Sequence, residues 1–254
     1  MNNDNTTVRK LYYGDSLVNI AVANDETQIP SAITSWSVDE WGKPVEIVVK
    51  NGQTTIPSNW QYNNVSLTSC TLPNTITSIG SYAFCGAGNN MIINIPTSVT
   101  NVSGNAFNNS SINNDLTIPY NSLSAATSGF SSTWYYGFAS SDLNNHTVTI
   151  ENNTTVIPKY MFYNTINATI IVPSSVTYLS SECFAVNTNG SKTVRFLGNV
   201  PPDAASYVYN NSNCPFYAYN KSYLDNLTII VPKYYVSNYK NKFGTDIGAR
   251  VQGI

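Results

Sequence analysis

His146 is the residue best suited to acid–base chemistry, and it is the single histidine of the chain. It lies in the segment NNHTVTI, just before an expected strand, and Asp142 is close to it in sequence. A hydrolytic triad needs a histidine that is oriented by a carboxylate and faces a nucleophile. The sequence has no G-x-S-x-G or comparable nucleophile motif. We therefore expect no catalytic residue.

The remaining acidic and thiol groups also lack a pattern typical of catalysis or metal binding. Adjacent acidic pairs such as Asp25–Glu26 point apart on a strand, whereas a glycosidase needs two facing carboxylates. The calcium-loop pattern D-x-[DN]-x-[DN]-G is absent. The cysteines have no metal-ligand spacing, and we expect buried free thiols. We predict a protein that is not an enzyme and uses no metal or cofactor. The cysteines are Cys70, Cys85, Cys183 and Cys214.

Low charge excludes several kinds of partner. Charged residues are 10% of the 254-residue chain, and the span 51–158 contains no Lys or Arg. Nucleic-acid binding and attachment to anionic lipid both need clustered cations. No apolar run approaches the length of a membrane helix, and the start MNNDNTTVRKLYYGD has no apolar signal-peptide region. We expect neither nucleic acid nor membrane insertion, and no Sec signal unless a leader has been removed.

A repeated segment must position whatever surface remains. Pro73, Pro96 and Pro119 follow one another at intervals of 23 residues, and so do Phe84, Phe107 and Phe130. A fixed period of this size is the signature of a leucine-rich-repeat solenoid. Each repeat reads as a short strand with alternating apolar residues, a proline that ends it, and apolar residues three, six and eleven places later, such as Ile76, Ile79 and Phe84. The phenylalanines should form a ladder through the core.

The outward positions of these strands carry hydroxyl and amide side chains. A row of them could hydrogen-bond sugar hydroxyls or a peptide edge. The alternative is a solvated sheet surface that is rich in Thr because Thr favours strands. The binding candidates on this face are Thr71, Asn94, Thr117 and Thr149.

Two insertions break the period, after Pro119 and after Leu197, and both are rich in aromatic residues. Insertions in repeat proteins map to loops that often form the binding face. Tyr and Trp suit sugar stacking and protein interfaces alike. They could equally fold back to cover the ends of the repeat array. The binding candidates here are Phe130, Trp134, Tyr135, Tyr136 and Phe138 in the first insertion, and Tyr217 and Tyr219 in the second.

Three regions follow from these patterns. Residues 1–44 contain two runs of β-formers around a turn at residues 14–16, and we expect a hairpin that anchors the chain. Residues 45–200 are the repeat solenoid. Residues 201–254 hold the second insertion, a last strand and a C-terminal cap. The fold should be mainly β, with a parallel sheet and little regular helix.

The segments TLPNTITSIGSYAFCG and IVPSSVTYLSSECFA resemble the repeat of BspA-like leucine-rich proteins. The ending, VRFLGNVPP followed by LTIIVPKYYVSNYKNKF, is similar to the closing segment of many such chains from gut Bacteroidetes. The resemblance covers about residues 45–254. It implies a mainly cell-surface family that binds host or bacterial ligands and is not enzymatic, yet the signal peptide, lipobox Cys and anchoring tail are absent from this sequence.

Two functions remain open. The first is a bacteriophage virion component, a fibre, decoration or receptor-binding protein that adheres to a host-surface glycan or protein. It is indicated by the repeat without an export signal, and by KLYYGDSLVNIAV, which is similar to short modules at the start of phage structural proteins. Residues 1–44 would then contact other virion proteins, and a homo-oligomer is possible. The second is a bacterial cell-surface leucine-rich-repeat adhesin whose signal peptide is missing from this sequence.

Overall fold

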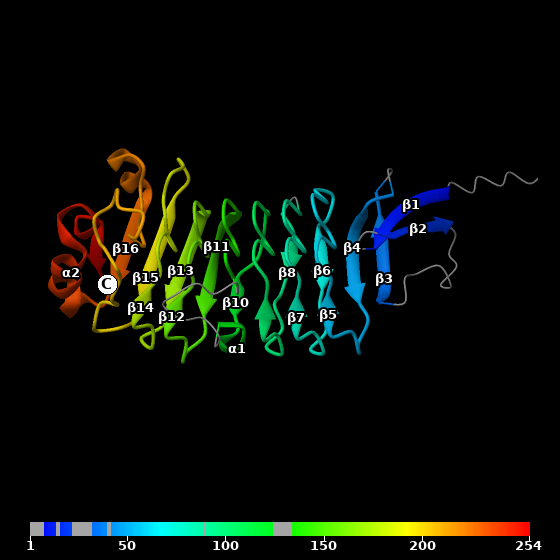
Figure 1. The fold of residues 1–254 in the computed structure, drawn as a ribbon, viewed down its shortest axis with the longest axis horizontal. Helices are drawn as coiled ribbons and strands as arrows, with labels where there is room; N and C mark the ends of the chain where they lie inside the picture. The colour runs from blue at the N-terminus through cyan, green and yellow to red at the C-terminus, as the bar shows by residue number, and fades with distance from the viewer. Residues whose placement is uncertain (1–7, 14–15, 22–31, 40–41, 89, 124–133) are drawn as a thin grey trace, which may run out of the picture.

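The structure is a computed structural model that describes residues 8–13, 16–21, 32–39, 42–88, 90–123 and 134–254. In Figure 1 the strands of successive repeats lie side by side along the long axis, with β1 and β2 near one end and α2 at the other. The strands are β1 Val8–Tyr13, β2 Ser16–Ala21, β3 Ile33–Val38, β4 Pro44–Val49, β5 Thr55–Ile56, β6 Ser69–Thr71, β7 Ser78–Ile79, β8 Ile92–Ile93, β9 Asn101–Val102, β10 Leu116–Ile118, β11 Asp142–Ile150, β12 Val156–Ile157, β13 Ile166–Val172, β14 Tyr178–Leu179, β15 Lys192–Phe196, β16 Leu227–Val231 and β17 Val251–Gly253. The helices are α1 Tyr120–Leu123 and α2 Val236–Gly248, with 3-10 turns at Lys221–Asn226 and Lys233–Tyr235.

The repeats contribute to two rows of parallel strands. One row consists of a four-stranded sheet, β3-β4-β6-β8, and a six-stranded sheet, β10-β11-β13-β15-β16-β17. The other consists of two-residue strands in the orders β5-β7-β9 and β12-β14. Pairing between repeats is parallel in each sheet, whereas β3 and β4 pair in the antiparallel sense. The mainly β, parallel architecture predicted from the period is confirmed.

Period-two alternation explains which strand residues are buried. In β11, Val148 and Ile150 are buried while Thr149 between them is partly exposed. Val148 lies opposite Ile170 of β13, which lies opposite Val194 of β15. Identical alternation in neighbouring strands therefore places their apolar residues in one continuous core, as the sequence predicts.

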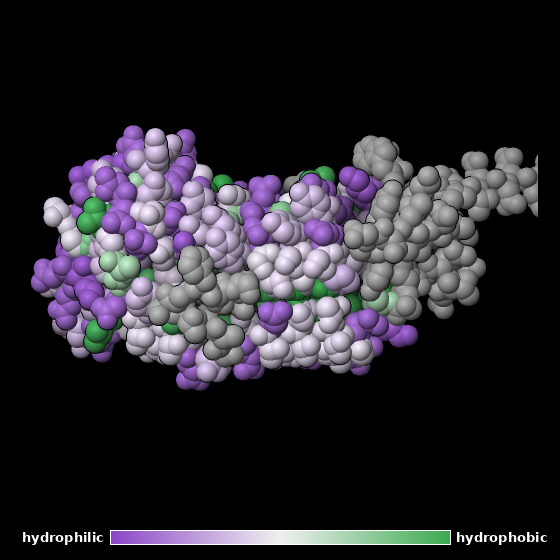
Figure 2. Space-filling view, viewed as in Figure 1, coloured by the Kyte–Doolittle hydropathy of each residue, from purple (hydrophilic) through white to green (hydrophobic). Residues whose placement is uncertain are grey.

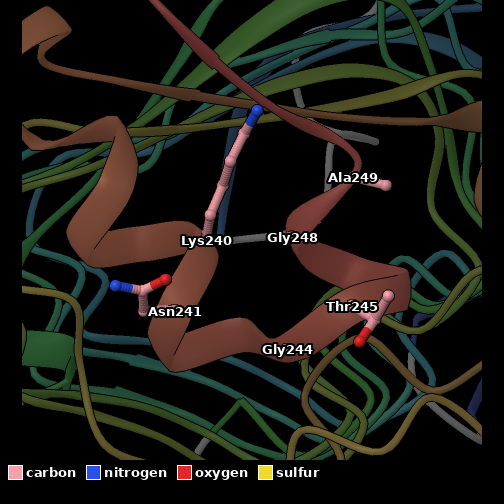
Figure 3. Close-up of a pocket in the computed structure, with 6 residues that line it drawn as sticks. All are labelled: Lys240, Asn241, Gly244, Thr245, Gly248 and Ala249. Atoms are coloured by element: carbon pink, nitrogen blue, oxygen red, sulfur yellow. The ribbon is translucent and has the colours of Figure 1, made fainter.

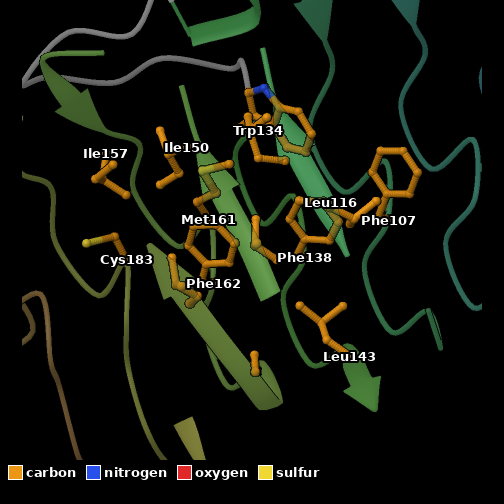
Figure 4. Close-up of a cluster of buried hydrophobic side chains, with 14 of the residues drawn as sticks. Phe107, Leu116, Trp134, Phe138, Leu143, Ile150, Ile157, Met161, Phe162 and Cys183 are labelled. Carbon is orange, nitrogen blue, oxygen red and sulfur yellow. The ribbon is translucent and has the colours of Figure 1, made fainter. Parts of the chain in front are cut away.

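The predicted phenylalanine ladder exists, and we call it the inner stack. Neighbouring rings are stacked, with centroids 5.2 to 5.8 Å apart. The 23-residue spacing predicts Phe130 as the ring after Phe107, but Phe138 occupies that place (Figure 4), because the insertion delays the slot. Phe130 lies outside the described residues. The inner stack consists of Phe84, Phe107, Phe138, Phe162, Phe184 and Phe216.

The N-terminal region contains the expected hairpin and one strand that the sequence did not indicate. β1 and β2 pair in the antiparallel sense and form a two-stranded sheet of their own. β3 pairs instead with β4, the first strand of the repeat array. The division at residue 44 stays a prediction.

Helix α2 covers the C-terminal end of the core. Tyr239, Phe243 and Ile247 are fully buried, and the Tyr239 hydroxyl donates to the Gly198 carbonyl at 2.9 Å. After α2 the chain returns as β17, which extends the six-stranded sheet by parallel pairing with β16 and was not expected. No described helix has the length and apolar character needed to cross a membrane.

Candidate functional site: a tyrosine cluster on the repeat edge

Each inner-stack phenylalanine sits in the middle of a run of tight turns at one edge of its repeat. The phenylalanine N–H donates to the next repeat, as Phe84 does to the Ala106 carbonyl at 2.7 Å. The following residue instead bonds back within its own repeat, as Cys85 does to the Tyr82 carbonyl at 3.2 Å. Alternate residues thus link repeats or close turns, and the edge becomes a continuous hydrogen-bonded ladder.

The turns of this ladder contain left-handed backbone. In five successive repeats it occurs at the residue two places before the inner-stack phenylalanine. Among the described residues, ten of the sixteen non-glycine residues with positive φ are Asn. Asn tolerates this conformation because its short side chain bonds locally to the backbone. Part of the high Asn content, 36 residues, is therefore a backbone requirement rather than a binding surface.

The residues two places before the phenylalanines form a line that we call the outer row. Four of its five members have positive φ without being Asn or Gly, with φ between 54° and 59°. Left-handed backbone costs an ordinary residue roughly 1–2 kcal/mol. The outer row consists of Tyr82, Asn105, Tyr136, Tyr160 and Glu182.

Two outer-row tyrosines belong to a group of four half-buried rings, the tyrosine cluster of Tyr135, Tyr136, Tyr160 and Tyr163. The rings of Tyr136 and Tyr160 are parallel, with centroids 4.4 Å apart and planes 3° apart. Tyr135 meets both rings edge-on at 4.9 and 5.3 Å. Tyr163 meets both edge-on at 5.8 Å. Two neighbouring repeats thus present one aromatic surface.

Two charged side chains border the tyrosine cluster. The Lys159 ammonium lies 4.5 Å from the centroid of the Tyr160 ring. Glu182 is buried and hydrogen-bonded to Tyr160. Burial raises the pKa of Glu182, while the bond from Tyr160 and the charge of Lys159 act the other way. Burial and then the Glu182 charge raise the pKa of Tyr160 to about 12. Tyr160 therefore stays protonated and can donate a hydrogen bond.

The structure separates the candidates of the first insertion. Tyr135 and Tyr136 lie in the tyrosine cluster, whereas Trp134 and Phe138 are fully buried and stack with Phe107 (Figure 4). The Trp134 indole N–H donates to the Ser122 hydroxyl at 3.0 Å. Trp134 and Phe138 therefore belong to the core and offer no surface to a ligand, which corrects the expectation for these two.

The second insertion contributes less to this surface. Tyr217 is half-buried and interacts electrostatically with Tyr163 of the cluster. Tyr219 is 81% exposed, with its N–H bonded to the Asn187 side chain. Tyr217 is therefore near the cluster, and Phe216 before it belongs to the core.

The polar candidates on the strands do lie on the outer face of the sheets. Thr71, Asn94 and Thr117 are exposed, and Thr149, half-buried, pairs with Thr117. Beyond Thr149 the same register continues with other residue types, so the hydroxyl row stops there. The residues that follow Thr149 in this register are Ile171, Arg195, Ile230 and Gln252.

His146 has a carboxylate partner, but it is Asp115 and not Asp142. Its Nδ1 lies 3.2 Å from Asp115 Oδ1, and its Nε2 lies 3.3 Å from Asn113 Oδ1. The Thr147 N–H, followed by His146, lowers the pKa of Asp115. Both ring nitrogens therefore face oxygen acceptors, and this geometry holds the strand ends of two repeats together. Within the described ranges, no three His, Cys, Asp or Glu side chains gather where a metal ion could bind.

Helix α2 has a shallow depression at its kink, where Gly244 has φ 73° (Figure 3). Of its six lining residues, Lys240 alone is ionisable. All six belong to α2 and the turn that follows, and no second element brings a polar group to it. We assign it no role.

Sequence reasoning missed Tyr160, Tyr163, Glu182 and Lys192. The outer-row members could have been found by comparing the residues two places before each phenylalanine. Lys192 occupies an inward strand position; its Nζ donates to the Phe162 and Ala185 carbonyls at 2.6 and 2.7 Å. Burial lowers the pKa of Lys192 to about 7. The cysteines are free, as expected; Cys85 is half-buried and the other three are buried.

Comparison with known proteins agrees with the repeat geometry. A family model described as the BspA type leucine rich repeat region matches in six copies, over residues 54–191 and 134–222. No curated protein matches the chain. The matched residues span more than half of the chain and include both the inner stack and the outer row. The chain therefore belongs to the BspA-type leucine-rich repeat family.

Proposed function

We propose that this chain is a non-enzymatic recognition protein, in which the repeats form a rigid solenoid and the tyrosine cluster contacts the ligand. The observation that carries the proposal is the set of four half-exposed tyrosine rings gathered at one repeat edge. Tyrosine is enriched where proteins bind partners, because it adds contact area and a hydrogen bond at low entropic cost. Family membership supports a binding role.

The threonine-rich face is a weaker candidate for the same role. Its hydroxyl row is interrupted beyond Thr149, and its side chains offer little apolar area. It can extend a contact that begins at the tyrosine cluster.

The finer proposal is that the chain is a bacteriophage virion component that adheres to a host-surface glycan or protein. Residues 1–44 would dock it to other virion proteins. The separate two-stranded sheet of β1 and β2 supports this docking, since it pairs with no other described strand. A bacterial cell-surface adhesin is the alternative, and membership of the BspA-type family favours it.

Two experiments test these statements. Mass spectrometry of purified phage particles should detect this chain, and its absence from virions would leave the adhesin alternative. Fluorescently labelled protein should bind cells of gut Bacteroidetes, and the double variant Tyr136→Asn/Tyr160→Asn should lose that binding. Tyr234→Asn is the matched control, because Tyr234 is 90% exposed on the C-terminal cap. Equal binding by the double variant and the control would contradict the role of the cluster.

A further inference from the structure

We propose that the ligand of the tyrosine cluster is an uncharged, linear glycan that lies along the outer row. This inference rests on the proposed function and narrows it to one chemical class. Three observations carry it: the backbone strain of the outer row, the composition of the repeat edge, and the length of the row.

The strain is concentrated where large side chains face outward. Of the six non-glycine, non-Asn residues with positive φ in the described chain, four belong to the outer row. Asn would satisfy this backbone at lower cost, as it does at Asn105 and Asn109. Bulky residues held in left-handed backbone cluster at ligand-contacting sites. The side chains of Tyr82, Tyr136 and Tyr160 are therefore candidates for a role beyond folding.

The described turn positions of the repeat edge offer mainly hydroxyls, amides and rings, with Val65 as an exposed aliphatic side chain at its N-terminal end. Such a surface matches sugars, whose hydroxyls donate and accept while their C–H faces pack on aromatic rings. A protein partner would be expected to find apolar anchor sites as well. Hydrophilic and near-neutral residues dominate the face drawn in Figure 2, and strongly hydrophobic ones are scattered. The exposed or half-buried turn residues include Asn59, Tyr62, Asn63, Ser81, Tyr82, Asn105, Asn108, Asn109, Tyr135, Tyr136, Ser140, Tyr160, Tyr163 and Asn164.

The charge of this edge argues against an anionic ligand. The span 51–158 lacks Lys and Arg, and the Lys159 ammonium and the Glu182 carboxylate, of opposite charge, both contact Tyr160. A sulfated or uronic-acid polymer would meet a carboxylate and almost no cation. A neutral chain meets neither penalty.

The length of the row indicates a polymer rather than a single sugar. The outer row runs through five successive repeats whose backbones are hydrogen-bonded neighbours, as in Tyr82 to Gly104 and Tyr160 to Ser181. With about 4.8 Å between paired backbones, five rungs span roughly 19 Å. Tyr62 extends the aromatic line, because its ring lies 6.3 Å from that of Tyr82. Several sugar units are needed to cover such a surface.

Affinity electrophoresis tests the ligand class directly. Native gels contain dextran, mannan, laminarin or xylan as neutral probes, and dextran sulfate or polygalacturonate as charged ones. We expect at least one neutral polysaccharide to retard the wild-type protein, and Tyr136→Asn/Tyr160→Asn to abolish this retardation. Tyr234→Asn should migrate like wild type. The double variant should lose less stability than Phe107→Ala, since Asn suits the left-handed backbone, although Tyr160→Asn removes the hydrogen bond to Glu182.

Each outcome decides the inference. Retardation by charged polymers alone, by no polymer, or equally in the double variant overturns it. A separate assay distinguishes this from failure of the proposed function: labelled protein is added to bacterial cells treated with periodate or with proteinase K. Loss after periodate supports the glycan. Loss after proteinase alone retains the recognition function but overturns the glycan, and absence of binding to untreated cells contradicts the proposed function itself.

Discussion

The inner stack and the outer row are two ladders of side chains built by the same repeats, two residues apart in sequence. The phenylalanines are fully buried and lie face to face at a regular spacing. The outer-row tyrosines are partly exposed, sit in left-handed backbone and share the row with Asn105 and Glu182. Burial explains why every position of the inner stack is a phenylalanine. It does not explain the tyrosines of the outer row, which suggests that one repeat position serves folding and the other serves recognition.

The largest expected effect is in the inner stack. Phe107→Ala should lower the free energy of unfolding by about 3–5 kcal/mol, because the ring is fully buried between Phe84 and Phe138. Urea denaturation followed by circular dichroism measures it. A loss below about 1 kcal/mol would mean that the inner stack does not hold the repeats together.

The next effect tests whether water is excluded from the buried Lys192 side chain. Lys192 has a folded pKa of about 7 against an ordinary 10.5, so unfolding takes up a proton between these values. Stability should therefore rise with pH through this window, by roughly 2–3 kcal/mol from pH 7 to pH 9. Lys192→Met should flatten this dependence of stability on pH, because it removes the titrating amine. The variant should still fold, because the Phe162 and Ala185 carbonyls each keep a backbone N–H partner. Lys159→Met, on the edge, is the control; an unchanged profile in Lys192→Met would show that solvent reaches the ammonium.

A smaller effect is expected in the outer row. Tyr136→Asn loses the stacked contact with Tyr160, worth about 0.5–1.5 kcal/mol, but gains about 1–2 kcal/mol from relieved left-handed strain. The net change in unfolding free energy should lie within about 1 kcal/mol of zero. Chemical denaturation beside Phe107→Ala gives the comparison, and a loss of 3 kcal/mol or more would make the outer row a second structural ladder.

The smallest effect concerns Asn as a backbone residue. Asn109→Ala should destabilise by about 1 kcal/mol, since Asn109 is exposed and has φ 55°. Asn74→Ala is the control, because Asn74 is also exposed and lies outside the positive-φ set. Equal melting temperatures for the two variants would contradict the view that Asn content serves the ladder.

The sequence predicted the core better than the surface. Period and alternation located Ile76, Ile79 and Phe84, because burial leaves a hydrophobic pattern along the chain. The insertion before Phe138 led to the wrong prediction of Phe130 as the next ring. Spacing alone does not show how many residues an insertion adds before the repeat resumes. Left-handed backbone has no hydrophobic signature, so Tyr160 and Glu182 were not recognised as partners of Tyr136. β17 is three residues long and was identified only through its pairing with β16.

The most direct test of the two-ladder account measures unfolding and binding on one preparation of Tyr136→Asn/Tyr160→Asn. We predict a urea midpoint clearly above that of Phe107→Ala, together with loss of binding to bacterial cells. A double variant that retains cell binding while its midpoint falls by as much as that of Phe107→Ala would contradict the account, because both ladders would then be structural.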